Sequence, residues 1–232
     1  MYLFYSLADL ERDIVPLPDY ILVNGSLARD RLVAAGLDSG KLHISGALRY
    51  EYLKNVRSHG TTPGSDKVIL VIPASGFNET VELITKVLQA FEGSGNLRLI
   101  IKLHPTIPAD TIMKNFSTLP ENFSFSQEPV ETLLDRTDLL LFSETAVSIE
   151  ALARHIPILH IKSDFRIDMN LFEGISFVSS VRTPEEIRVK ATELLSPSGT
   201  ENFAFDETVT AFFAPVDEKI VEIFFHHEQT MD

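Results

Sequence analysis

Short apolar segments alternate with segments of helical period along most of this chain, and this alternation limits the folds it can adopt more than any other feature. Strands that alternate with helices form βαβ units, in which the strands run parallel and the crossovers are right-handed. We therefore predict an α/β fold with a Rossmann-like, doubly wound parallel sheet. The predicted strands begin near residues 68, 97, 123, 139, 157 and 176, and the predicted helices cover residues 79–91, 109–116, 130–136, 147–153 and 184–195.

A smaller block of the same kind comes first. Its strand at residues 20–24 is followed by a helix with Ser26 as its expected N-cap and Gly36 as its stop, and then by a strand at residues 41–46. One βαβ unit cannot cover both faces of its own strands. We therefore expect residues 1–57 to be the terminal part of a larger Rossmann-like N-terminal domain whose beginning is absent.

Composition shifts suggest three further boundaries. Residues 58–66 are rich in Gly, Pro, Ser and Thr, which is typical of a linker. Residues 67–202 hold the regular α/β pattern. Residues 203–232 form a predicted C-terminal helical tail, whose several Phe residues and helix near 217–225 need a docking surface.

Composition also excludes several classes of function. A net charge of −13 over 232 residues argues against a nucleic-acid partner, because binding a polyanion needs a basic surface. The absence of cysteine excludes disulfides, thiolate catalysis and thiolate zinc sites, and the histidines show no metal-binding pattern. No apolar run reaches the length of a transmembrane segment, and the first residues lack the basic start of a signal peptide. We expect a cytoplasmic protein, and peripheral membrane association stays open.

Lys102 and His104 follow the apolar strand LRLII, and Pro105 ends that segment. Strand period places Lys102 and His104 on one face, at the carboxyl end where open α/β sheets bind ligands. A histidine that titrates near neutrality can hold or protonate a phosphate oxygen of a leaving group. The alternative is that His104 bonds a loop carbonyl while Lys102 extends into solvent.

Three polar residues, Ser143, Glu144 and Thr145, lie where another apolar strand turns into a helix. The hydroxyl and N–H groups of such a turn can bind phosphate, whereas plain helix capping needs only one hydroxyl. Glu150, one to two turns into the helix, could accept both hydroxyls of a ribose.

The loop after the first strand of the larger block contains Ser75, Gly76 and Asn78. Asn78 is the expected N-cap of the following helix. Gly76 allows a ligand to approach the backbone, and a tight turn explains it equally well. The chain lacks the three-glycine dinucleotide fingerprint and the P-loop, so NAD-dependent and ATP-hydrolysing functions are not expected.

A long polar loop, KSDFRIDMNLFEG at residues 162–174, is the last candidate segment. Solvated charge explains most of it, although its place beside the fourth-strand loop makes it a candidate wall for a base or sugar. His160, inside the preceding strand, is expected to be a satisfied core residue.

The motifs KLHP, FSETAVSIEA and IPILHI together resemble the donor-binding C-terminal domain of GT-B glycosyltransferases and the related nucleotide-sugar 2-epimerases. The resemblance covers about residues 66–195. It is nearest to surface-polysaccharide enzymes that use CMP- or CDP-activated donors, such as bacterial sialyltransferases, polysialyltransferases and CDP-glycerol glycerophosphotransferases. Residues 1–57 look like the end of the family's N-terminal, acceptor-binding domain.

The resemblance implies roles for single residues. His104 and Pro105 match a His-Pro motif that contacts donor phosphates, Ser143 and Thr145 straddle the place of a hydroxyl pair, and Glu150 matches a ribose-binding glutamate. Two departures are Glu144, a carboxylate between the two hydroxyls, and His155, where the epimerases usually have glycine.

These observations predict part of a glycosyltransferase or polyol-phosphate transferase of surface-polysaccharide synthesis. The expected catalytic residue is His104. The expected partners are a saccharide acceptor, the missing N-terminal domain and a nucleotide-activated donor carrying CMP, CDP or UDP, with no cofactor or metal. The expected donor-binding residues are Ser75, Gly76, Asn78, Lys102, Pro105, Ser143, Glu144, Thr145 and Glu150. The alternatives are a nucleotide-sugar 2-epimerase and a non-catalytic nucleotide-binding or scaffold domain.

Overall fold

The computed structural model describes residues 8, 10–11, 14–56, 66–116, 118–168, 170–196, 200 and 203–226. The chain divides into two compact units. The larger is Arg57–Phe203, and the smaller combines Met1–Val56 with Ala204–Asp232. Of the linker predicted at residues 58–66, all but Asp66 lies outside the described residues.

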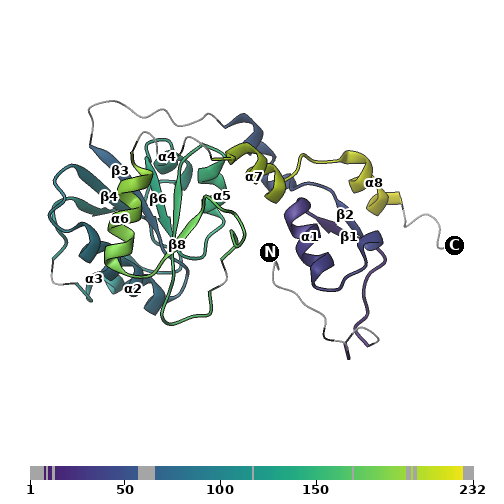
Figure 1. The fold of residues 1–232 in the computed structure, drawn as a ribbon, viewed down its shortest axis with the longest axis horizontal. Coiled ribbons are helices and arrows are strands. Elements are labelled where there is room, and N and C mark those ends of the chain that lie inside the picture. Colours follow the sequence, from purple (N-terminus) through teal and green to yellow (C-terminus); the bar gives the residue numbers. More distant parts are fainter. Residues whose placement is uncertain are drawn as a thin grey trace. The chain divides into compact units, whose positions relative to one another are not determined.

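The larger unit is built on a parallel six-stranded sheet with the strand order β5-β4-β3-β6-β7-β8 (Figure 1). This confirms the predicted α/β class and the doubly wound parallel sheet. Its strands are β3 (Lys67–Ile72), β4 (Leu97–Ile101), β5 (Phe123–Phe125), β6 (Leu139–Phe142), β7 (Ile158–Ile161) and β8 (Ser179–Val181).

Helices connect the strands of this sheet. They are α2 (Phe77–Phe91), α3 (Ala109–Met113), α4 (Val130–Leu134), α5 (Val147–Leu152) and α6 (Pro184–Leu194). Helix α2 packs against α3 and α6, while α5 contacts β6 and β7. Because β3–α2–β4 and β6–α5–β7 run in opposite directions across the sheet, right-handed crossovers put α2 and α5 on opposite faces.

The two central strands form the core of this unit. Ile69, Leu70 and Val71 of β3 pair with Leu139–Leu141 of β6, and all six side chains are fully buried. A parallel strand covered by helices on both faces needs a continuous apolar sequence rather than an alternating one. The runs VILVI and LLLF meet that requirement.

The smaller unit contains the predicted βαβ unit. Strands β1 (Ile21–Val23) and β2 (Leu42–Ile44) pair in parallel, and helix α1 (Ser26–Ala34) connects them. The 3₁₀ helices η1 (Ser39–Lys41) and η2 (Leu48–Asn55) precede and follow β2. The C-terminal segment, predicted to be helical, contains α7 (Phe205–Phe212), which was not placed from the sequence, and α8 (Glu218–His226).

Helix α7 packs on α1, and the chain after α7 bonds to the ends of β1 and β2. The N–H of Ala214 donates to the Asn24 carbonyl at 2.8 Å, and that of Asp217 donates to the Ser45 carbonyl at 3.0 Å. A Cβ on Gly25 would lie 2.3 Å from the Ala211 carbonyl oxygen. Only glycine therefore lets this segment approach so closely.

Two expected helix caps differ from the structure. Helix α1 begins at Ser26 with Gly25 as its N-cap, and α2 begins at Phe77 with Gly76 as its N-cap. Asn78 thus lies in the first turn of α2. The predicted stop at Gly36 is confirmed, since this residue has a φ of 97° directly after the helix end.

Candidate functional site

The sheet reverses its strand order between β3 and β6. The chain leaves β3 toward β4 on one side and leaves β6 toward β7 on the other, so the loops after β3 and β6 diverge. Such a switch point is where open α/β sheets bind ligands, outside the carboxyl ends of the strands. The loops that follow β3, β6 and β7 meet here.

Ser143 joins two of these loops. Its hydroxyl accepts a 2.8 Å hydrogen bond from the N–H of Ala74, and its side chain is buried. Ala74 directly precedes Ser75, which is exposed, and Gly76, which is half-buried. Ser143 therefore sets the position of the loop after β3 as well as facing the switch point.

Gly76 makes room for a carboxylate. Its φ of −83° is ordinary, so backbone conformation does not require glycine here. A Cβ on Gly76 would instead lie 2.1 Å from Oε2 of Glu79, whose side chain folds back over the start of α2. The contact is with the far end of a flexible side chain, and both interpretations of Gly76, ligand approach and a tight turn, stay predictions.

Arg166 lies between two carboxylates, one from the first turn of α2 and one from the loop after β6. Its Nε is 3.5 Å from Oε1 of Glu79, and its Nη1 is 3.4 Å from Oε2 of Glu144. A small cavity of about 10 Å³ at this place is lined by Ala74, Glu79, Ser143, Glu144, His160, Ile161, Ser163, Arg166, Ile167 and Asp168. Ser163, Arg166, Ile167 and Asp168 of the polar loop therefore line the switch point.

His104 lies at the same end of the sheet but outside the lining of this cavity. It is exposed, and the Thr106 N–H donates to its Nδ1 at 3.3 Å, with the Thr106 hydroxyl 2.7 Å from the same atom. An Nδ1 that accepts these bonds leaves the proton of the neutral ring on Nε2. His104 can therefore donate from Nε2 to an anion.

Lys102 and Pro105 flank this histidine. Strand β4 ends at Ile101, and the N–H of Lys102 continues the ladder by donating to the Val71 carbonyl at 3.0 Å. The Lys102 side chain is half-buried and Pro105 is exposed.

Thr145 has a local role in the turn before α5. Its hydroxyl accepts from the N–H of Val147 at 3.3 Å, and its carbonyl accepts from the Ser148 hydroxyl at 2.6 Å. The two hydroxyls thus have different roles. Ser143 bonds the loop after β3, and Thr145 bonds within its own turn. Glu150 lies within the six-residue helix α5, half-buried.

His160 is a satisfied core residue, as expected. It is buried in β7, and its Nδ1 lies 3.0 Å from the Ser180 hydroxyl. Burial lowers its pKa from the usual 6.5, the Asp168 carboxylate 3.8 Å from Nε2 opposes that shift, and the Lys162 charge adds to it. Burial dominates, because the 3.8 Å separation of Asp168 from Nε2 of His160 is too long for a hydrogen bond.

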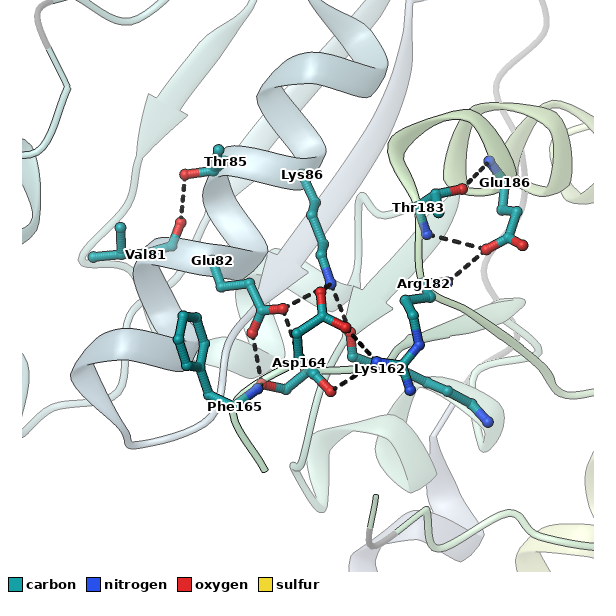
Figure 2. Close-up of polar contacts among 11 residues, drawn as sticks. Val81, Glu82, Thr85, Lys86, Lys162, Asp164, Phe165, Arg182, Thr183 and Glu186 are labelled. Carbon is teal, nitrogen blue, oxygen red and sulfur yellow. Dashed lines mark hydrogen bonds and ion pairs between the residues drawn. The ribbon is translucent and has the colours of Figure 1, made fainter. Parts of the chain in front are cut away.

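The loop that carries Arg166 is anchored to α2 (Figure 2). Both oxygens of Glu82 accept, one from the Ser163 hydroxyl at 2.6 Å and one from the Asp164 N–H at 2.7 Å. Lys86 donates to Asp164 at 2.9 Å, and Arg182 pairs with the same carboxylate. These hydrogen bonds, from Lys86 first, lower the pKa of Asp164 to about 2.

A wider groove of about 530 Å³ runs along α2 beside this anchor. Asn78 lines the groove rather than the switch-point cavity, together with Phe77, Val81, Phe165 and Pro184.

Sequence reasoning therefore located the loops, including the one that carries Arg166, but did not single out Arg166 or Glu79. The available signal for Arg166 was its place in a long loop after a strand that neighbours the Ser143 strand. The sequence gives no signal for Glu79, because its position depends on how its side chain folds back over Gly76.

Among the described residues, no group of three acidic, histidine or cysteine side chains could hold a metal ion. No described helix has the length and apolar character needed to cross a membrane.

No protein-family model and no curated protein matches the sequence. Solved structures do match the fold. The calicheamicin glycosyltransferase CalG4 aligns with a TM-score of 0.60 at 15% identity, over 96% of this chain and 56% of its own.

Two UDP-GlcNAc 2-epimerases align similarly. The enzyme of Methanocaldococcus jannaschii, in complex with UDP-GlcNAc and UDP, gives a TM-score of 0.61 at 14% identity, over 90% of this chain and 61% of its own. The enzyme of Neisseria meningitidis, bound to UDP-GlcNAc, gives 0.60 at 15% identity, over 90% and 62%. At these identities the likeness establishes the Rossmann-like fold of GT-B glycosyltransferases and 2-epimerases. The chain spans less than two thirds of each.

Proposed function

We propose that this chain is the donor-binding part of a GT-B-type glycosyltransferase or polyol-phosphate transferase of surface-polysaccharide synthesis. The observation that carries the proposal is the switch point, where Ser143 ties together the loops after β3 and β6 and Arg166 supplies a cation. Support comes from the fold neighbours, since two of them were solved with UDP-GlcNAc.

The donor's phosphates lie, in this proposal, between the loop of Ser75 and Gly76, the hydroxyls of Ser143 and Thr145, and Nε2 of His104. Lys102 and Pro105 complete the wall at His104, and Glu150 accepts the ribose hydroxyls, whereas Asn78 lines the neighbouring groove. Hydrogen-bond donors that point at the departing phosphate stabilise the negative charge that develops on it. This stabilisation is usually the largest contribution to catalysis. His104 is the acid for the leaving oxygen.

The nucleotide is tested by thermal melting of this chain with CMP, CDP, UDP and NAD. A nucleotide at 100 times its Kd stabilises a protein by about 2.7 kcal/mol, which shifts the melting temperature measurably. We expect a shift with at least one pyrimidine nucleotide and none with NAD. Equal melting curves with every nucleotide would show that this chain does not bind a donor by itself.

A 2-epimerase is the second candidate, favoured by the two fold neighbours of that activity. Product analysis of the whole enzyme separates the two, because an epimerase returns an epimer of the donor and a transferase a new linkage. Binding of nucleotide without turnover, with acceptors present, would instead indicate a sensing or scaffold role.

A further inference from the structure

Arg166 is held between carboxylates more loosely than an arginine normally is. Its two ion pairs measure 3.4 and 3.5 Å, whereas charged N–H···O hydrogen bonds are typically about 2.7–2.9 Å long. The Arg166 side chain is 41% exposed, and those of Glu79 and Glu144 are 15% and 27% exposed. The guanidinium is thus the most accessible charge of the three, and it can form shorter bonds with another anion.

The carboxylates outnumber the cations at this place. Glu79, Glu144 and Asp168 line the cavity, while the cations are Arg166 and Lys162, the latter 3.2 Å from Asp168. Asp168 therefore has its own partner, and Arg166 is shared by the two remaining carboxylates. The cluster therefore has a net negative charge, and an incoming phosphate has to displace the carboxylates from Arg166.

The backbone that carries Arg166 is fixed although its side chain is loosely held. Two residues earlier, the Asp164 N–H bonds Glu82, and the Asp164 carboxylate is bonded by Lys86 and Arg182 (Figure 2). The side-chain ammonium of Lys86 also donates to the Lys162 carbonyl at 3.0 Å. A cation on an anchored loop can exchange its anionic partner without rebuilding the site.

We propose that Arg166 is the phosphate-binding cation of the donor site, and that Glu79 and Glu144 occupy it until a diphosphate takes their place. The inference rests on the proposed function and names its substrate class, a nucleoside diphosphate linked to a sugar or polyol. Two carboxylates are displaced from one guanidinium, and a diphosphate supplies two anionic groups, whereas a CMP-linked donor carries a single phosphodiester charge. The planar guanidinium then donates two parallel hydrogen bonds to phosphate oxygens.

The test is calorimetric titration of this chain with UDP, CMP and inorganic pyrophosphate at one ionic strength. Arg166→Gln should weaken UDP binding by about 10-fold to 100-fold, the scale of hydrogen bonds to a charged group. Arg166→Lys should recover only part of this loss, because lysine lacks the planar fork. Glu144→Gln keeps the shape and removes the competing charge, so it should tighten UDP binding by about fivefold.

Matched controls exist on α6, where Arg188 and Glu185 form an exposed ion pair. Arg188→Gln and Glu185→Gln change the net charge by the same amounts and should leave UDP binding unchanged. Circular dichroism of each variant verifies its fold.

The outcomes separate this inference from the proposed function. If the parent chain and Arg166→Gln bind UDP equally, the inference is wrong and the proposed function stands. If pyrophosphate binds as tightly as UDP and loses affinity in Arg166→Gln, Arg166 is confirmed as a phosphate-binding residue. Recognition of the nucleotide by this chain is then not supported. If neither the parent chain nor Glu144→Gln binds any of the three probes, both are overturned.

Discussion

The N–H of Ala74 donates a 2.8 Å hydrogen bond to the hydroxyl of Ser143, and this bond joins residues 69 positions apart in the sequence. Both residues are buried. The bond therefore sets the separation of the two loops at the switch point. Its loss should affect stability and ligand binding together.

Ser143→Ala leaves the N–H of Ala74 without this acceptor. Leaving a buried donor unsatisfied costs about 1–3 kcal/mol, so we expect the free energy of unfolding to fall by that amount in urea denaturation. Thr192→Ala is the matched control, since the exposed Thr192 hydroxyl donates to a carbonyl one turn earlier in α6. An equal loss of unfolding free energy in the two variants would mean that the buried Ser143 bond stabilises the protein no more than an exposed one.

His160 should make the protein less stable in mild acid. Burial lowers its pKa below 6.5, so between the two pKa values the unfolded chain binds more protons than the folded one. Stability is then complete above pH 6.5 and falls as the pH drops toward the folded-state pKa. Melting temperatures from pH 8 to pH 5 should show this fall in the parent chain and in His104→Gln, and a smaller fall in His160→Gln.

Asp164 should give a second acid transition, at lower pH. Its pKa is lowered from 3.8 to about 2, first by Lys86, so its stabilising effect is present above pH 4 and disappears as the pH falls through 2. Asp164→Asn should therefore lower the melting temperature at pH 7 and make no difference near pH 2. In a Lys86→Met background, Asp164→Asn should lower the melting temperature at pH 7 much less. An undiminished effect of Asp164→Asn in that background would argue against Lys86 as the main partner.

His155 has a φ of 58°, a left-handed conformation that favours glycine. The N–H of His155 donates to the Leu152 carbonyl, and that of Ile156 donates to the Ala151 carbonyl, which together end α5. We expect His155→Gly to be more stable than His155→Ala by about 1 kcal/mol, since both lose the imidazole and only alanine keeps the strain. Chemical denaturation of the two variants measures the difference directly.

His104→Ala tests the proposed chemistry. Under the proposed function, turnover by the whole transferase should fall by roughly 10² or more, the scale for loss of one acid or anion-stabilising contact. Because His104 is exposed and its ring contacts are local, the fold should be retained. Near-normal steady-state rates in a folded variant would reduce His104 to a structural histidine.

The sheet could be predicted from the sequence because each buried parallel strand is a continuous apolar run, and its neighbours follow from the crossover rules. Within the predicted helical tail, the position of α7 could not be given, since this helix is short and packs on α1. The loops around Ser143 and Gly76 could be located because parallel strands share one carboxyl end. The partners of Arg166 could not be assigned, because Glu79 in the first turn of α2 and Glu144 in the loop after β6 reach it only in the folded sheet.

The smaller unit combines the first 56 residues with the segment that begins at Ala204, whereas the larger unit is continuous in sequence. During synthesis the larger unit, which ends at Phe203, leaves the ribosome before the Ala214 and Asp217 N–H groups that bond Asn24 and Ser45. Strands β1 and β2 therefore gain these bonds only after the larger unit has left the ribosome. Until then the face of α1 that α7 covers is exposed, so the nascent chain passes through a stage in which chaperones can bind it.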